Sequence, residues 1–244
     1  MSSVSSRLVV LGALALAAAC GDTGGERVAV PLFASGTPAR ALSIGDARVT
    51  LTRAEVAVGP IYLCASASAS AALCAVAVAE QLEPVLVHAL DPSAAPAAPL
   101  AATTGTTRSA MYDLGISWLL TQPGPQASAV APAGHSTVLE GTVERAGRTL
   151  RFSAGVDALP SGRGELTLNA QPTEHEITGQ DERLTLVVDA NGWVDRLDVD
   201  ALFALDTDGD GFVTIEPGTT TYDEILQGML SRSPPAFRWE SGST

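Results

Sequence analysis

The residues best suited to chemistry are three aspartates at alternate positions, Asp206, Asp208 and Asp210, which Gly211 follows directly. Alternate side chains on a curling backbone can converge on one point, and calcium prefers several hard oxygen ligands at about 2.3–2.6 Å. Without a cation, three crowded carboxylates repel one another unless they turn outward into water. The spacing therefore favours a calcium site, with a solvated acidic turn as the alternative.

The segment from Asp206 to Glu216 resembles a calcium loop of the EF-hand kind. That motif takes oxygen ligands at alternate positions, then a glycine, then a backbone carbonyl and a further ligand that is often bound through water. The resemblance implies that calcium is the cofactor. It also implies that the metal ligands are Asp206, Asp208, Asp210, the carbonyl of Phe212, Thr214 and Glu216.

The loop departs from the motif at its end, where Pro217 takes the place of a bidentate glutamate and Glu216 comes one position early. Either Glu216 closes a shortened loop, or Asp223 or Glu224 closes it from the next helix, or water fills the place. Extracellular calcium modules work with dissociation constants of about 10⁻⁴–10⁻³ M, so weak binding would still suffice for a structural role.

The N-terminus has the pattern of an export signal. One cation, Arg7, precedes an apolar run that is too short to span a bilayer as a helix. The small residues before Cys20 resemble the lipobox of bacterial lipoproteins, although Ala17 stands where leucine is usual. The resemblance implies a lipidated Cys20 and an anchor in the cell envelope, and Gly21 favours the outer membrane. The alternative is an ordinary secretory signal with Cys20 incidental.

The cysteine count supports the lipoprotein interpretation. Three cysteines are an odd number for an exported protein. With Cys20 assigned to lipid, Cys64 and Cys74 remain as one pair, and an oxidising compartment allows them to form a disulfide. In the chain-entropy model, a disulfide that closes a loop of this size stabilises the folded state by about 2.5–3 kcal/mol. The alternative, free thiols or metal ligands, lacks CxxC spacing, so we predict a structural disulfide.

The charge of the chain limits its partners. The formal net charge is −13, and loss of Arg7 with the signal makes the mature chain more acidic. Nucleic acid and anionic membrane surfaces both reward clusters of lysine and arginine. We therefore expect contact with the membrane through the lipid anchor and no nucleic-acid partner, while a protein or glycan partner is left unnamed.

Most of the chain has strand patterns, with β-branched residues and apolar positions two apart. In residues 111–119, Tyr112, Leu114, Ile116 and Trp118 are expected on one face of a strand and Asp113 on the other. Residues 136–157 read as a hairpin that turns at Ala146-Gly147. Repeated short strands with glycine-rich turns predict a mainly β fold, an antiparallel immunoglobulin-like β-sandwich.

The pattern changes after Trp193. Residues 199–203 have a helical stripe that Asp198 would cap, and a second helix follows the acidic loop, with Thr221 and Glu224 as its capping box. We expect a signal peptide (1–19), a lipidated tether (20–27), a β-sandwich domain (28–193), and a helix–calcium loop–helix appendage packed on the sandwich (194–244).

Patterns of catalysis are missing from the sequence, which has no GxSxG, HExxH or P-loop motif, so we do not expect an enzyme. The histidines have no second histidine at the spacing of a metal site, and they are more typical of surface residues than of ligands. Large aromatics usually belong to the core, although they could also form a sugar-stacking surface. These residues are His88, His135, His175, Trp118, Trp193 and Trp239.

The export signal, the early cysteine pair, the sandwich strands and the Trp-Val-Asp segment at 193–195 together resemble small periplasmic lipoproteins. Some of these are β-sandwiches similar to the methanobactin-associated copper-binding family, but no copper ligands match residue by residue. The leading hypothesis is a non-enzymatic, lipid-anchored envelope protein that calcium stabilises and that serves in binding or assembly. The alternatives are a periplasmic transition-metal-handling protein and a carbohydrate-binding or carbohydrate-active secreted protein.

Overall fold

The computed structural model describes residues 25–68, 74 and 77–241. The expected signal peptide and the lipidation of Cys20 lie outside these residues. None of the helices in the described ranges is long and apolar enough to cross a membrane.

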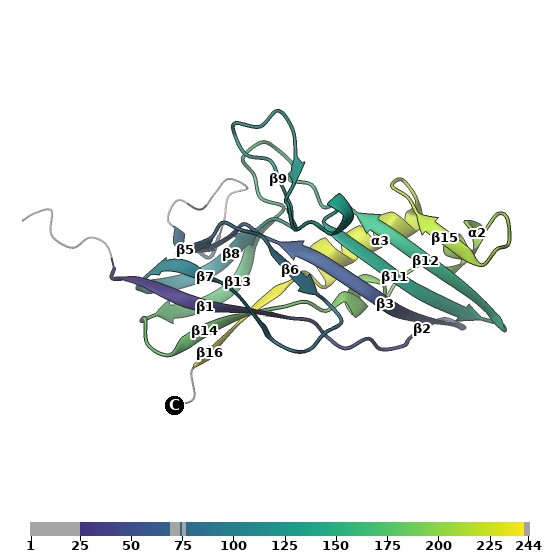
Figure 1. Cartoon of the computed structure of the whole chain (residues 1–244), viewed down its shortest axis with the longest axis horizontal. Helices are drawn as coiled ribbons and strands as arrows, with labels where there is room; N and C mark the ends of the chain where they lie inside the picture. Colours follow the sequence, from purple (N-terminus) through teal and green to yellow (C-terminus); the bar gives the residue numbers. More distant parts are fainter. Residues whose placement is uncertain (1–24, 69–73, 75–76, 242–244) are drawn as a thin grey trace, which may run out of the picture.

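The described chain is mainly β and forms two large sheets at opposite ends of an elongated molecule (Figure 1). The first sheet has eight strands, in the order β13 (Leu168–Ile177), β8 (Gly105–Tyr112), β4 (Ile61–Cys64), β5 (Ala77–Gln81), β7 (Ala95–Thr103), β1 (Arg27–Ser35), β14 (Glu182–Val187) and β16 (Ala236–Ser241). The second has the order β15 (Phe212–Ile215), β12 (Arg148–Val156), β11 (Thr137–Arg145), β3 (Ala47–Val58) and β2 (Leu42–Ile44), and β6 (Val85–His88) also pairs with β3.

Short elements complete the fold. Two small strands, β9 (Ile116–Ser117) and β10 (Gln126–Ala127), pair with each other. The helices are α2 (Val199–Ala204) and α3 (Thr220–Gln227), and α3 continues into a π-helical turn, Gly228–Arg232. Two 3₁₀ turns cover Pro132–Gly134 and Ala190–Trp193.

The prediction of a mainly β fold is confirmed, but the sheets are mixed rather than purely antiparallel. Strand β1 pairs in parallel with β14, and β12 pairs in parallel with β15. Parallel neighbours need long crossover connections, which local sequence patterns do not reveal. The segment after residue 194 also supplies a strand to each sheet, β15 to the second sheet and β16 to the first.

The predicted hairpin is confirmed. Strands β11 and β12 pair over their whole length, from Thr137 opposite Val156 to Arg145 opposite Arg148. The two turn residues, Ala146-Gly147, both have positive φ, at 49° and 80°. A two-residue turn of this kind has the backbone twist that a right-handed strand pair requires.

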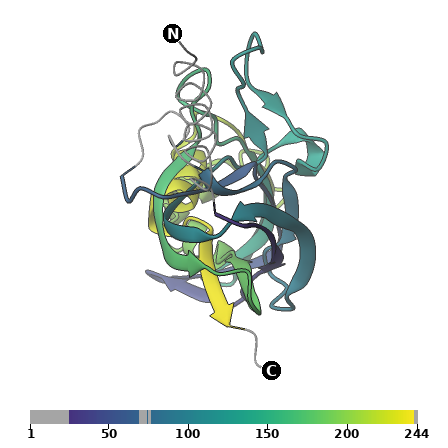
Figure 2. The same cartoon turned by 90° about the vertical axis from the view of Figure 1, so that its left-hand side faces the viewer.

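The two edge strands of the first sheet, β13 and β16, approach each other and nearly close the sheet on itself. Trp239 of β16 donates from Nε1 to Thr173 Oγ1 of β13 at 3.1 Å. Its ring also stacks on His175 with 4.0 Å between ring centroids. Figure 2 looks onto this end of the molecule, with β16 in yellow. An edge covered in this way is protected from pairing with other chains.

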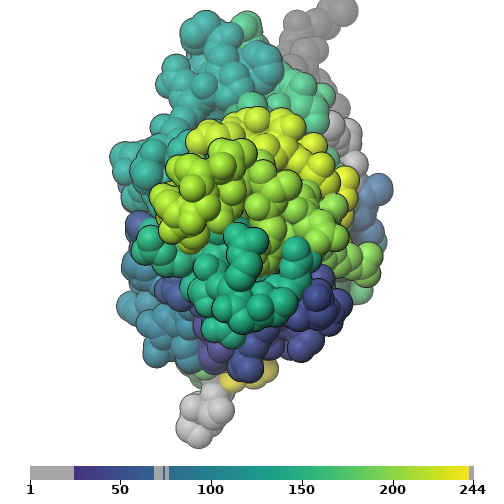
Figure 3. Space-filling view, turned by 90° about the vertical axis from the view of Figure 1, so that its right-hand side faces the viewer, coloured from purple at the N-terminus to yellow at the C-terminus, as the bar shows by residue number. Residues whose placement is uncertain are grey.

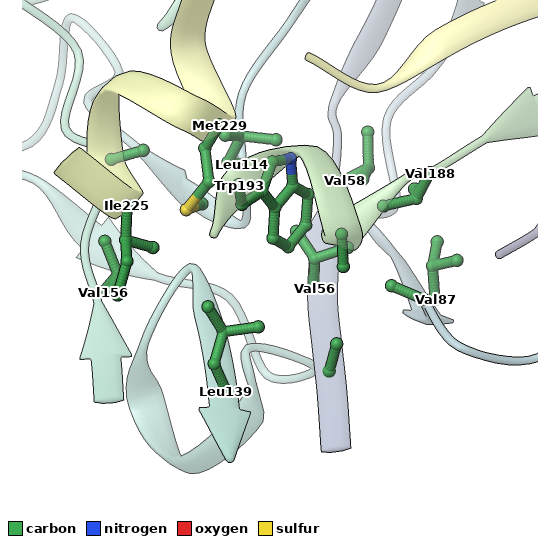
Figure 4. Packing of buried hydrophobic residues seen from close by; sticks show 14 of the residues in the cluster. Val56, Val58, Val87, Leu114, Leu139, Val156, Val188, Trp193, Ile225 and Met229 are labelled. Atoms are coloured by element: carbon green, nitrogen blue, oxygen red, sulfur yellow. The ribbon is translucent and has the colours of Figure 1, made fainter. Parts of the chain in front are cut away.

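One hydrophobic core joins buried residues of both sheets to the C-terminal helical segment. Figure 4 shows Trp193 within this core, near Leu114 and Met229, with Val56 of β3 directly below its ring in the view. Trp193 is fully buried, and its Nε1 donates to the carbonyl of Ser233 at 2.7 Å. The polar group of the largest buried side chain therefore has a hydrogen-bond partner, as is usual for a buried indole.

The predicted disulfide is confirmed, because Cys64 and Cys74 are bonded with their Cα atoms 5.7 Å apart. Cys64 ends β4, and Cys74 lies shortly before β5, the neighbour of β4 in the first sheet. The bond therefore joins the two ends of the connection between these neighbouring strands.

The strand predicted over residues 111–119 is shorter than expected, since β8 ends at Tyr112. Leu114 and Ile116 are buried as predicted, but Asp113, which we expected on the solvent face, is only 1% exposed. The expectation was wrong because the chain leaves the sheet here. The backbone carbonyl of Asp113 instead accepts a hydrogen bond from Gly59 N at 2.8 Å.

The Asp113 carboxylate is held by hydrogen bonds from a segment distant in sequence. Its Oδ1 accepts from the backbone N and the Oγ1 of Thr167, at 2.9 and 3.1 Å. Burial raises the pKa of the Asp113 carboxyl above its ordinary value, and the hydrogen bonds from Thr167 and Ser117 oppose this shift. The charged form is thus disfavoured where the fold places it.

This raised pKa predicts a pH-dependent contribution to stability. The folded protein holds the proton of Asp113 more tightly than the unfolded chain does. In an unfolded chain the pKa of an aspartate carboxyl is about 3.9. The associated stabilisation is fully present below the unfolded pKa and is lost as the pH rises through the folded pKa. Asp113→Asn keeps an acceptor for Thr167 and cannot ionise, so we expect its stability relative to the wild type to increase from about pH 4 to about pH 7.

Urea unfolding at several pH values measures this difference. The exposed Asp46→Asn serves as the control and should show no such trend. A difference between Asp113→Asn and the wild type that does not vary with pH would contradict the prediction.

Candidate metal centre

The helix α2 carries the chain into the acidic loop. Asp198 caps α2 as predicted, with its Oδ1 accepting from Ala201 N at 3.0 Å. Leu202 of α2 is fully buried in the core, and the helix ends at Ala204. Asp206 follows two residues later, so its backbone is set by a capped and anchored helix.

The three aspartates predicted as ligands do gather. Each of Asp206, Asp208 and Asp210 offers one carboxylate oxygen, and these oxygens lie within 4.8 Å of one another. Two oxygens bound to one calcium at about 2.4 Å lie at most about 4.8 Å apart. The group could therefore hold a metal ion.

Hydrogen bonds within the loop fix its backbone. Asp206 Oδ1 accepts from Gly211 N at 3.3 Å, Asp208 Oδ1 from Asp210 N at 3.4 Å, and Asp210 Oδ1 from Phe212 N at 2.8 Å. Gly211 has a φ of +78°, a conformation that favours glycine. The expectation that a glycine allows the sharp turn here is confirmed.

The three carboxylates differ in exposure. The Asp206 side chain is 1% exposed, whereas Asp208 and Asp210 are exposed. Arg148 supplies a cation, with Nη2 at 3.4 Å from Asp206 Oδ2, but the Arg148 side chain is itself 65% exposed. A single long contact with an exposed arginine compensates a buried carboxylate only weakly.

Arg148 belongs to a pair of arginines that the sequence analysis did not single out. Arg145 and Arg148 flank the turn between β11 and β12, and both lie over the ring of Phe203 in α2, at 4.7 and 5.2 Å. Arg145 also pairs with Asp200 of α2. The signal for this contact in the sequence was the presence of two arginines on either side of a tight turn, together with an acidic residue in the helix that they contact. In Figure 3 the acidic loop region, in lime, lies against this teal hairpin.

The predicted ligands after Asp210 lie on or next to a strand. Phe212 and Thr214 belong to β15, which pairs in parallel with β12, and Glu216 follows it. The acidic loop thus enters a strand before the second helix begins. Glu216 lies outside the group of three carboxylates within 4.8 Å, and its carbonyl accepts from Thr219 N and Oγ1 at 3.3 and 2.9 Å.

The second helix begins earlier than predicted. Thr219 is the N-cap of α3, and its Oγ1 accepts from Tyr222 N at 3.2 Å. The predicted capping box of Thr221 and Glu224 is wrong, since Thr221 lies inside the first turn and is buried. The turn at Pro217-Gly218, where Gly218 has a φ of +87°, precedes Thr219 and the start of the helix.

Glu224 has a different partner from the one expected. Its Oε2 accepts from the backbone N of Asp198 at 2.7 Å, so it joins α3 to the start of α2. Partial burial raises the pKa of the Glu224 carboxyl, and the hydrogen bond from Asp198 N opposes that shift. Asp223 is exposed on the same helix. Glu224 therefore links the two helices that flank the acidic loop.

The histidines lie apart from the acidic loop, and each is close to one carboxylate. The pairs are His88 with Glu55 at 3.4 Å, His135 with Asp157 at 3.0 Å, and His175 with Glu182 at 2.8 Å. Within the described ranges, the cluster of three metal-ligating groups contains aspartates and no histidine. The site therefore offers oxygen ligands, which suit hard cations.

Comparison with known proteins adds one structural likeness. No protein-family model matches the chain, and no curated protein matches it. The chain is similar to the solved structure of MbnP from Methylosinus trichosporium, with a TM-score of 0.39 and 10% sequence identity, over 89% of this chain and 99% of that chain. At this TM-score the likeness carries no argument about the site or its function.

The hydrogen bond of Glu224 predicts a selective loss of stability. Glu224→Ala removes the acceptor for Asp198 N, and we expect it to lower the free energy of unfolding by about 1 kcal/mol. Asp223→Ala, one residue away and exposed, should have a clearly smaller effect, and Glu224→Gln should retain most of the stability. Chemical denaturation measures all three. Equal losses for Glu224→Ala and Asp223→Ala would show that the link contributes nothing.

Proposed function

We propose that this protein is a non-enzymatic, lipid-anchored cell-envelope protein, with an immunoglobulin-like arrangement of its sheets, that calcium stabilises at one end and that serves in binding or assembly. The observation that carries the calcium part is the gathering of Asp206, Asp208 and Asp210 oxygens within 4.8 Å. The anchor part rests on the sequence around Cys20.

The electrostatics of the loop support a bound cation. The carboxylate of Asp206 is almost fully enclosed and has two neighbours at long distances, Gly211 N at 3.3 Å and Arg148 Nη2 at 3.4 Å. A buried carboxylate normally requires close charge compensation. A divalent ion between Asp206, Asp208 and Asp210 would supply it and remove the repulsion among the three groups.

The ligand types favour calcium over other ions. The donors are carboxylates, with the carbonyl of Phe212 and the hydroxyl of Thr214 proposed to join them. Calcium accepts six to eight such oxygens in flexible geometry, whereas magnesium demands a near-ideal octahedron and keeps several waters. Transition metals prefer nitrogen or sulfur ligands, and the cluster offers none.

The alternatives find less support. A transition-metal role would be favoured by histidines that converge, but the three histidines pair with different carboxylates. A sugar-stacking surface would be favoured by exposed tryptophans, but Trp193 is fully buried in the core. Trp239 is half-buried and stacks on His175. We therefore retain calcium stabilisation as the proposed role of the site.

Calcium should raise the melting temperature of the protein. With a dissociation constant of about 10⁻⁴–10⁻³ M, calcium at about 10 mM would stabilise the folded state by about 1.4–2.7 kcal/mol. That gain corresponds to a shift of roughly 3–10 °C for a chain of this size. The measurement is thermal unfolding in calcium, in magnesium and in chelator.

The matched variants separate a specific site from general screening. Asp208→Asn combined with Asp210→Asn changes two exposed side chains and should abolish the calcium response. Glu144→Gln, an exposed carboxylate on β11, should leave it intact. If calcium and chelator give the same melting temperature for the wild type, the metal has no place in the function.

Lipid attachment is tested separately. Expressed with its own N-terminus in a bacterial host, the chain should incorporate labelled palmitate and partition with membranes, because Cys20 would receive the lipid. Cys20→Ala should lose the label. Label that persists in this variant, or a wild-type chain without label, would refute the anchor without affecting the calcium proposal.

A further inference from the structure

A pocket of about 220 Å³ is lined by residues that directly follow β9, the strand labelled in the upper part of Figure 1, and it contains none of the three aspartates of the acidic loop. Three segments of the chain line it: Pro60 directly before β4 with Tyr62 of β4, the stretch from Trp118 to Thr121, and the stretch from Gly164 to Leu166. Asp113 also contributes to the lining. A water molecule occupies about 30 Å³ in the liquid, so the space holds about seven water-sized groups, which suits a small organic molecule.

The walls of this pocket are tied to each other and to the sheet. Gly164 N donates to the carbonyl of Trp118 at 2.6 Å, which joins the two loops. Leu120 lies so close to Gly164 that an added Cβ there would come within 2.8 Å of its Cδ2 atom. The Asp113 carboxylate accepts from Thr167 directly after the third segment. The pocket is therefore built into the fold, as ligand sites usually are.

The lining is mainly apolar and aromatic, and its ionisable groups are acidic. Asp113 and Glu165 are the carboxylates, and none of the described residues that line the pocket is a lysine or an arginine. Burial, followed by the charges of Glu80 and Asp113, raises the pKa of the Tyr62 hydroxyl. The pocket therefore combines two aromatic rings with the Glu165 carboxylate, while the buried Asp113 is held by its hydrogen bonds from Thr167.

The exposed side chains at the pocket also favour a ligand with an apolar part. Leu119 and Leu120 are 50% and 73% exposed, although both contribute to the lining. Trp118 Nε1 is buried and has no hydrogen-bond partner among the described residues. An unpaired buried donor costs about 1–3 kcal/mol, so a hydrogen-bond acceptor on the ligand, such as a hydroxyl group, would complement this indole.

We propose that this pocket binds a small organic ammonium ion with an apolar body. Aromatic faces attract ammonium groups, and carboxylates add charge complementarity. A neutral apolar ligand would offer no charge partner to the Glu165 carboxylate, and an anion would meet no lysine or arginine among the described residues of the lining. Arg163 is not among the lining residues, and its guanidinium lies 6.0 Å from the centre of the Trp118 ring, at the outer limit of a cation–π contact.

This inference is independent of the calcium proposal, because the pocket and the acidic loop share no residues. Its test uses two probes of the same shape on the full purified chain, 3-hydroxyphenyltrimethylammonium and its neutral isostere 3-tert-butylphenol. Isothermal titration calorimetry measures both affinities. We expect the cation to bind at least tenfold more tightly than the isostere.

Variants locate the binding. Trp118→Leu keeps an apolar side chain and should lower the affinity for the cation at least fivefold. Glu165→Gln should reduce the preference of the protein for the cation over the isostere. Glu144→Gln, an exposed carboxylate on β11, is the matched control and should change neither affinity. Unfolding curves establish that each variant is folded.

Three outcomes would overturn the proposal. They are the absence of cation binding at millimolar concentration, equal affinity for the cation and the isostere, and cation binding that Trp118→Leu and Glu165→Gln leave unchanged. Equal affinity would mean that the pocket is an unselective apolar cavity, and unchanged binding would place the cation elsewhere.

Discussion

The burial of Trp193 is the interaction on which the arrangement of the two sheets and the C-terminal helices depends. Its ring is fully enclosed, its Nε1 donates to Ser233, and its carbonyl accepts from Arg232 at 3.3 Å. Gly228 packs so closely that an added Cβ would lie 2.5 Å from the Trp193 Cα atom. A tryptophan buries about 150–250 Å², so displacing this helical segment would expose the largest side chain of the core.

The acidic loop takes its shape from anchors at both of its ends. Leu202 holds the preceding helix in the core, and β15 pairs with β12 directly after the loop. The loop is therefore largely ordered by the fold, and a cation would have little conformational entropy left to remove on binding. A site of this kind could bind a cation even with an incomplete set of ligands, because packing elsewhere in the fold offsets the free-energy cost of bringing Asp206, Asp208 and Asp210 together.

Sequence reasoning succeeded where the signal was local. The turn at Ala146-Gly147, the cap at Asp198, the pairing of Cys64 with Cys74 and the gathering of the aspartates involve residues within about ten positions of each other. It failed where contacts join distant segments. The parallel pairing of β1 with β14 brings together residues about 150 positions apart, and no periodicity within either strand encodes that choice. Glu224 was misassigned for the same reason, since its partner belongs to another helix.

The error at Asp113 has a physical meaning beyond the missed strand end. The alternating pattern predicts that this carboxylate is exposed to water, but it is buried, and Thr167, 54 positions away, supplies hydrogen bonds that reduce the cost of its burial, together with Ser117. A site where local preference and global fold disagree is often functional, because burial of charge there is not explained by packing. The acidic loop is a second place where carboxylates are crowded or enclosed. On a chain with a formal net charge of −13, a cation would lower the electrostatic cost of crowded or enclosed carboxylates, and both proposals rest on this effect.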